Sequence, residues 1–258
     1  NELFWDDDVT PEGVAIGGLW VANGISIQPR AAYFITNTGN GDFDPKDPTN
    51  GMIDGYMLGG QLELGFHIKQ SKITLASSYY GLQGINNVPT TDFFYNGERF
   101  KLNYSFLVSG LKIEWPTKLP ITIGLDHFIN LENYEEIPDT LIHPVYKDQN
   151  VGFVISAEIG KLDGKGDWLC GYYFTRKEEY SVVSYYTEDD WIRLGNINRN
   201  RNTNYMGHEF RVAYAFDSRF DVVVRTYFVE GLVTPDIAKE SGSRFRIDFN
   251  MKFNKQLR

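Results

Sequence analysis

The last strongly patterned stretch of the chain, Arg244–Phe253, reads RFRIDFNMKF and alternates strictly between polar and apolar residues. One parity holds Phe245, Ile247, Phe249, Met251 and Phe253, and the other holds Arg246, Asp248, Asn250 and Lys252. A period of two residues places successive side chains on opposite faces of a β-strand. The stretch is therefore predicted to be a strand with one wholly apolar face and one polar face.

The same alternation recurs along the chain and predicts ten further strands. These are Val14–Ala22, Ile25–Thr36, Tyr56–Ile68, Ile73–Gln83, Tyr104–Trp115, Ile121–Leu131, Val151–Leu162, Trp168–Val183, Tyr205–Phe216 and Asp221–Val233. In a soluble β-sandwich the apolar faces would pack against each other. In a membrane barrel they would meet lipid, and the polar faces would line a water-filled lumen.

The lengths of the connections favour the barrel. Short turns such as Asn23-Gly24, a dipeptide suited to a tight hairpin with positive φ, alternate with long segments. The long segments are residues 39–55, 84–100, 132–150, 184–204 and 234–243. Outer-membrane barrels have short turns at one end and long loops at the other, whereas a soluble sandwich or propeller has no reason to sort its loops in this way. We predict an all-β fold, a transmembrane antiparallel up-and-down β-barrel with about 11 strands in this chain.

An odd number of strands has a consequence for the domain organisation. Single-chain bacterial barrels normally have an even number of strands and both ends on the periplasmic side. The acidic opening Asn1–Asp8 is too short for the roughly 9 to 11 residues of a tilted transmembrane strand. We therefore expect residues 1–258 to form a single β-barrel domain that is the C-terminal portion of a longer chain, within a barrel of roughly 16 to 18 strands.

Composition excludes several classes of protein. The net charge of −9 argues against a nucleic-acid partner, which would need a basic surface. No stretch approaches the roughly 18 to 20 uninterrupted apolar residues of a transmembrane helix. Cys170 is the single cysteine, so the chain has no internal disulfide framework.

Two segments carry a resemblance to a known family. Phe4–Ala15, which reads FWDDDVTPEGVA, and the closing RFRIDFNMKF resemble the porin family of Bacteroidetes-type Gram-negative outer membranes. In that family the acidic segment lies in the middle of the chain, so the resemblance also implies a missing N-terminal barrel portion. The tail Asn254–Arg258 departs from the aromatic ending of many outer-membrane barrels.

No catalytic motif is recognised, so we expect no enzymatic activity, no cofactor and no metal. Asp6, Asp7 and Asp8, and then Asp42, Asp44 and Asp47, could supply oxygen ligands to Ca²⁺, but solvated loop charge is the preferred interpretation. The residues singled out are charged side chains on the polar parity of the strands, which are predicted to line a pore or to form cross-strand salt bridges. They are Glu63, Asp126, Glu158, Glu209, Arg211, Arg225, Arg246, Asp248 and Lys252.

The sequence thus predicts a porin-like channel of the bacterial outer membrane for passive diffusion of small hydrophilic solutes or ions. The expected partners are outer-membrane lipid and lipopolysaccharide and the solutes themselves, with a homo-oligomer or a larger outer-membrane complex left open. An alternative is a structural or anchoring barrel whose lumen is plugged. A soluble β-rich binding protein is the third interpretation.

Overall fold

The fold is all-β and is dominated by one antiparallel sheet of 12 strands. The computed structural model describes residues 4, 12–36, 55–86, 94–95, 98–99, 101–184, 186–188, 190–191, 202–233 and 240–252. The strands of the large sheet are β1 (Glu12–Gly17), β2 (Trp20–Ala22), β3 (Ile25–Ile35), β4 (Tyr56–Ile68), β5 (Ser71–Asn86), β8 (Lys101–Trp115), β9 (Ile121–Asn130), β10 (Val151–Gly160), β11 (Trp168–Lys177), β12 (Tyr205–Ala215), β13 (Phe220–Gly231) and β14 (Ser241–Met251). A separate hairpin is made by β6 (Phe94–Tyr95) and β7 (Glu98–Arg99), and Pro144–Tyr146 forms a 3₁₀ turn, η1.

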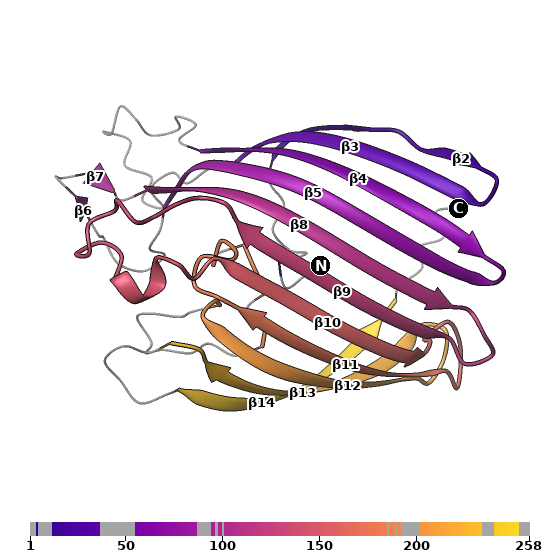
Figure 1. Ribbon diagram of the computed structural model, residues 1–258. Coiled ribbons are helices and arrows are strands. Elements are labelled where there is room, and N and C mark those ends of the chain that lie inside the picture. Colours follow the sequence, from indigo (N-terminus) through magenta and orange to yellow (C-terminus); the bar gives the residue numbers. More distant parts are fainter. Residues whose placement is uncertain are drawn as a thin grey trace, which may run out of the picture.

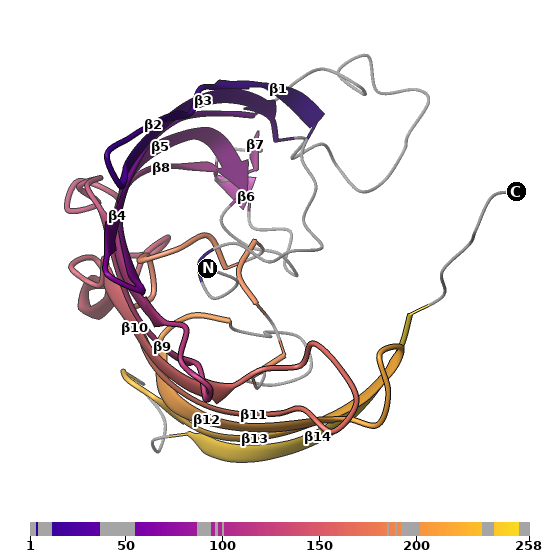
Figure 2. The same ribbon diagram turned by 90° about the vertical axis from the view of Figure 1, so that its right-hand side faces the viewer.

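The strands follow one another around the sheet in chain order, which confirms the up-and-down topology. The order is β1-β3-β4-β5-β8-β9-β10-β11-β12-β13-β14, with β2 also paired to β3. The strands are tilted (Figure 1), and the sheet curves into a C when it is viewed from the end that carries the short turns (Figure 2). β1 and β14 form its two edges and have no second partner among the described strands. The architecture is barrel-like but not closed.

The predicted asymmetry of the connections is confirmed, because all the short turns lie at one end of the sheet (Figure 1). Asn23 and Gly24 have φ values of 50° and 76°, as the predicted tight hairpin turn requires. Gly160 begins a second short connection with φ of 98°. A Cβ atom there would lie 2.1 Å from the carbonyl oxygen of Trp168, so only glycine fits this close approach.

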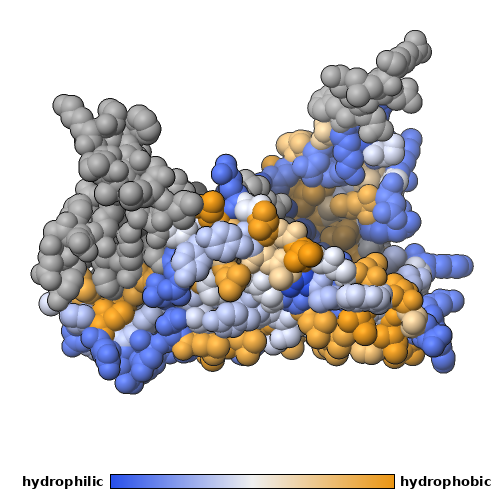
Figure 3. Space-filling view, turned by 90° about the horizontal axis from the view of Figure 1, so that it is seen from above, coloured by the Kyte–Doolittle hydropathy of each residue, from blue (hydrophilic) through white to orange (hydrophobic). Residues whose placement is uncertain are grey.

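The convex face of the sheet is apolar along rows of register-matched residues. One such row crosses seven strands through Ile27, Leu64, Leu75, Leu111, Leu125, Ile155 and Phe174. No layer of described residues covers these side chains, and large apolar residues are widely exposed, such as Phe210 at 50% and Phe249 at 70%. Hydrophobic residues gather along the outer side of the sheet in Figure 3. For β14, the prediction that Phe245, Ile247, Phe249 and Met251 share one apolar outward face is thereby confirmed.

The concave face is covered near the long-loop end by two coils, of which the first was expected to be a loop and the second to be partly strand and partly loop. Residues 131–150 and the described residues of 178–191, which are 178–184, 186–188 and 190–191, fold back into the hollow of the sheet, where the second coil is visible in Figure 2. They bury apolar side chains against the strands. The buried side chains of coils and strands together form two clusters. The first contains Met57, Leu82, Leu102, Tyr104, Phe106, Tyr134, Ile142, Tyr180 and Val183, and the second contains Phe128, Val154, Val182, Trp191, Tyr205, Tyr227 and Val229.

The predicted strand Trp168–Val183 is wrong over its last six residues. β11 ends at Lys177, because Glu178 turns the chain: its carboxylate accepts a hydrogen bond of 2.8 Å from the amide of Val151. The Ser181 hydroxyl then donates to the carbonyl of Glu178. The apolar residues after this turn pack inside the hollow instead of continuing the strand.

The predicted first strand, Val14–Ala22, is also divided. β1 and β2 both pair with β3, but the ladder is interrupted at Gly18 and Leu19, which face Gln28 and Pro29. Pro29 has no amide hydrogen to donate, so a regular ladder cannot continue there. β5 and β8 are longer than predicted, and β6 and β7 lie within the predicted loop 84–100. The described residues include no helix long and apolar enough to cross a membrane.

A lipid environment for the convex face predicts a graded response to charge along β14. Ile247 lies near the middle of this strand, whereas Phe249 is close to its end at the short turns. Ile247→Arg should therefore lower the free energy of unfolding in phospholipid vesicles by about 2–4 kcal/mol, and Phe249→Arg by less. Urea titration of the refolded protein measures both. A near-neutral effect at both positions would contradict lipid contact.

Candidate functional site

Three arginines lie side by side on the concave face. Arg211 of β12 pairs in register with Arg225 of β13, which pairs in register with Arg246 of β14. The strand alternation turns all three side chains inward, because their neighbours Phe210, Val224 and Ile247 occupy the opposite parity. Like charges directly opposite each other destabilise a sheet, so this row needs acidic partners.

Three carboxylates pair with the arginines, and a fourth is connected to the row through Tyr173. Glu209, which is 2% exposed, accepts a hydrogen bond of 2.7 Å from Nε of Arg211. Asp248 lies 2.6 Å from Nε of Arg246 and 3.6 Å from Nε of Arg225. Asp190, on the inward coil, forms an ion pair with Arg246, and it lies 3.3 Å from Arg244. The fourth, Glu158 of β10, accepts from the hydroxyl of Tyr173 beside Arg211.

The inward coil 178–191 is held on the wall at several further points. The ammonium of Lys177 donates to the Thr187 hydroxyl at 2.9 Å and lies 4.7 Å from the ring centre of Tyr205. The Trp191 ring packs on Tyr205 and Tyr227, with centroid distances of 6.2 and 5.7 Å. The coil therefore closes over the arginine row by both charge pairing and aromatic packing.

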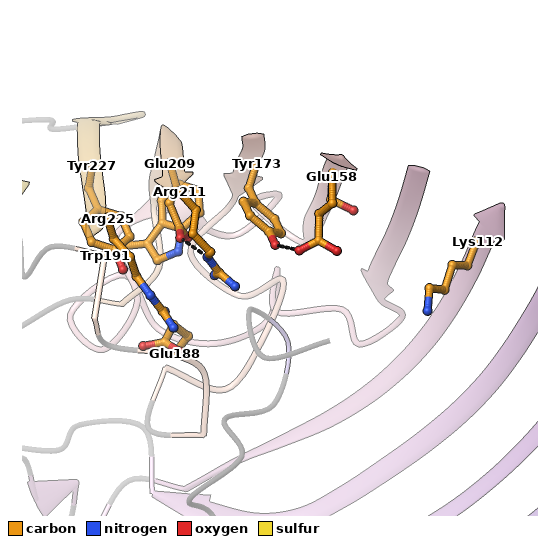
Figure 4. A pocket seen from close by; sticks show the side chains of 10 residues that line it. Lys112, Glu158, Tyr173, Glu188, Trp191, Glu209, Arg211, Arg225 and Tyr227 are labelled. Atoms are coloured by element: carbon orange, nitrogen blue, oxygen red, sulfur yellow. Dashed lines mark hydrogen bonds and ion pairs between the residues drawn. The ribbon is translucent and has the colours of Figure 1, made fainter. Parts of the chain in front are cut away.

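A cavity of about 510 Å³ lies where this coil meets the wall (Figure 4). Its lining residues come from β8, β10, β11, β12, β13 and the coil 178–191. They are Lys112, Ser156, Glu158, Tyr173, Glu188, Trp191, Glu209, Arg211, Arg225 and Tyr227. Three basic and three acidic side chains thus share the cavity with three aromatic rings, and the Arg211 guanidinium lies 4.5 Å from the ring centre of Tyr173.

Groups at the two ends of the sheet titrate away from their ordinary ranges. In the turn between β12 and β13, the amides of Arg219 and Phe220 donate to Asp217 and hold its pKa below the ordinary value. The turn therefore gains stability from this carboxylate above the unfolded-state pKa, and that gain is lost as the pH falls through the folded-state pKa. In the inward coil 131–150, burial raises the pKa of Tyr134, so its phenol stays neutral and donates to the carbonyl of Asn103.

The structure brings six of the nine predicted pore-lining residues together on β10 to β14. They are Glu158, Glu209, Arg211, Arg225, Arg246 and Asp248. Glu63 and Asp126 also lie on the concave side, but on β4 and β9, and the nearest cation to Glu63 is Arg30 at 3.6 Å. Lys252 follows the end of β14, where its amide bonds to Arg219 at the short turns, away from the cavity.

Several residues of the cavity were not singled out from the sequence. Lys112, Ser156, Tyr173 and Tyr227 lie on the inward parity of predicted strands, so the alternation could have found them. Glu188 and Trp191 belong to a coil without any period, so no sequence pattern points to them. Their position depends on the turn at Glu178, which ends β11 early.

The calcium hypothesis cannot be placed on the structure. Asp6, Asp7, Asp8, Asp42, Asp44 and Asp47 all lie outside the described residues. Within the part of the chain that is described, no group of three or more histidine, cysteine, aspartate or glutamate residues is arranged to hold a metal ion.

Comparison of the sequence with protein-family models and with curated proteins found no match.

Removing the charge of Asp190 should loosen the inward coil. Asp190→Asn weakens a partly exposed ion-pair network with Arg244 and Arg246, which we expect to cost about 1 kcal/mol of local stability. Amide hydrogen exchange of residues 180–187 should then be roughly fivefold faster, because these amides exchange through local opening.

Asp163→Asn is the matched control, since Asp163 pairs with Lys161 in an exposed short turn. Its exchange in residues 180–187 should equal that of the wild-type protein. If Asp190→Asn also left these rates unchanged, the ion pairs would not be holding the coil.

Proposed function

We propose that the protein forms a porin-like channel of the bacterial outer membrane that lets small hydrophilic solutes or ions diffuse passively. The observation that carries this proposal is the distribution of polarity over the sheet, whose outer face is apolar and whose inner face is polar. The convex face exposes apolar residues along its whole width, while the concave face carries the charged row and the polar cavity. A sheet with this distribution of polarity suits lipid outside and water inside.

The charged row gives the channel a means of selection. Arg211, Arg225 and Arg246 place three positive charges on one side of the hollow, and each lies beside a carboxylate, so the wall carries a row of paired charges. Charged side chains lining a pore bias which ions pass. Diffusion past this wall needs no chemical step, so the proposal includes no enzymatic activity.

Membership of the porin family that the sequence resembles belongs to the same proposal. So do contact of the convex face with lipid and lipopolysaccharide and assembly into an oligomer or a larger complex of the outer membrane. What supports lipid contact is the aromatic content of the register row nearest the short turns, where Trp168, Tyr214, Val222 and Phe249 lie in sequence across four strands. Tryptophan and tyrosine are enriched at the boundary between membrane and water.

One observation favours a second candidate, a structural or anchoring barrel with a plugged lumen. The coils 131–150 and 178–191 and the side chain of Phe4 occupy the hollow near the long-loop end. The Phe4 ring lies 5.3 Å from that of Phe106 and 5.5 Å from that of Phe128. Apolar packing of this kind narrows the path for water, and its completeness decides between a channel and a plug.

Planar-bilayer recording tests the proposal. The purified full-length protein should produce discrete conductance steps, and Arg225→Gln should shift the reversal potential in a salt gradient toward cation preference, because it removes one positive charge from the wall. The matched control is Lys118→Gln, which removes an exposed positive charge from the short turn between β8 and β9.

The channel and the plugged barrel predict different conductance for the wild-type protein and for a third variant, Asp190→Asn. A plugged barrel would be silent as the wild-type protein and would conduct only after the coil is loosened, as in Asp190→Asn. A wild-type protein that inserts into bilayers and never conducts would overturn the channel proposal. Equal reversal potentials for the wild-type protein and Arg225→Gln would show that ions do not pass the arginine row.

A further inference from the structure

We infer that the cavity beneath the coil 178–191 is a binding site for a neutral, hydroxyl-rich molecule of the size of a mono- or disaccharide, a sugar subsite along the diffusion path. This inference deepens the proposed function by naming a substrate class for the channel, and it depends on that proposal for the route by which the sugar arrives. The cavity itself is defined by its lining residues (Figure 4).

The size of the cavity is suitable for such a ligand. Its volume of about 510 Å³ lies within the range of roughly 300–1,000 Å³ that is usual for small-molecule sites. The walls come from β8, β10, β11, β12 and β13, which belong to one continuous sheet, and the coil closes one side. The site is therefore largely preformed.

The charge balance argues against an ion as the ligand. Lys112, Arg211 and Arg225 face Glu158, Glu188 and Glu209, so the six formal charges cancel. Each of the six also has a partner within the protein: Lys112 lies 2.9 Å from Glu114, Arg211 pairs with Glu209, and Arg225 pairs with Asp248. Glu158 accepts from Tyr173, and Glu188 interacts with its surroundings. The lining residues therefore present no surplus of either sign that would attract an ion.

The pattern of donors and acceptors favours hydroxyl groups. Guanidinium and ammonium groups only donate, and carboxylates only accept, whereas a sugar hydroxyl can do both. Basic and acidic side chains are interleaved along the wall, with Glu158 on β10, Glu209 and Arg211 on β12 and Arg225 on β13. A zwitterion such as a dipeptide would instead be matched by a cavity with its basic side chains at one end and its acidic side chains at the other.

Two further features point to a ligand. The Tyr227 hydroxyl is fully buried at the cavity wall and has no hydrogen-bond partner of good geometry among the described residues, although Arg225 lies beside it. Buried hydroxyls normally have a partner, which a ligand hydroxyl could supply. The ring of Tyr173, which is only partly buried, adds apolar surface against which the carbon–hydrogen face of a sugar ring can pack.

Equilibrium dialysis of the full-length protein in detergent, with maltose as the probe, tests the site independently of conductance. Saturable maltose binding is expected. Tyr173→Leu should weaken it about tenfold by removing a ring and a hydroxyl from the wall, and Ser156→Leu should weaken it at least as much by filling the cavity without removing a buried apolar contact. The matched control is Tyr79→Leu, since Tyr79 lies on the exposed convex face of β5, and it should bind maltose like the wild-type protein.

The outcomes separate this inference from the channel proposal. A protein that conducts ions but shows no saturable maltose binding overturns the sugar subsite and leaves the channel standing. A protein that binds maltose in this cavity but never conducts overturns the channel and keeps the subsite. Tighter binding of glycylglycine or gluconate than of maltose would overturn the assignment to a neutral sugar, as would unchanged binding in both Tyr173→Leu and Ser156→Leu.

Discussion

The structure depends on one constraint, the two-residue period of the β-strand imposed on a single continuous sheet. Because each strand is hydrogen-bonded in register to the next, an outward residue on one strand stands beside an outward residue on its neighbour. The row from Ile27 to Phe174 shows this on the convex face. The same register forces Arg211, Arg225 and Arg246 into one row on the concave face. The apolar exterior and the charged interior are therefore two results of one pairing pattern.

A wide curved sheet with a polar concave face leaves a hollow that its own side chains cannot fill, and the long connections respond to it. The coils 131–150 and 178–191 carry apolar residues inward and bury them near the long-loop end. Asp190 and Lys177 attach the second coil to the wall by charge and hydrogen bonding. The apolar packing stops at Trp191 and Tyr227, beyond which the wall becomes charged, and the cavity lies at this boundary.

Much of this arrangement could be predicted from the sequence, because alternation reports directly which face a strand residue occupies. The strands, the order of the turns and the inward direction of Glu158, Glu209 and Arg211 follow from parity alone. The coil that completes the cavity could not be predicted, since Tyr180, Val182 and Val183 extend the apolar pattern of the preceding strand past the true turn at Glu178. An apolar residue in the sequence indicates burial or contact with lipid, but it does not indicate which element will cover it. Trp191 is positioned by that tertiary packing and by no local signal.

The edges of the sheet set a geometric condition on how the hollow can be enclosed. Ten antiparallel pairings separate β1 from β14, so these two strands run in the same direction. Joining them directly would make a parallel pair, whereas closure by antiparallel pairing requires an odd number of additional strands between them. In lipid an unpaired strand edge leaves backbone amide and carbonyl groups without partners, which is costly, so a membrane environment favours a closed wall. The exposed apolar side chains of β14 and the pairing of its free edge are therefore linked, because a lipid medium that favours exposed Phe245 and Phe249 would also penalise an open backbone beside them.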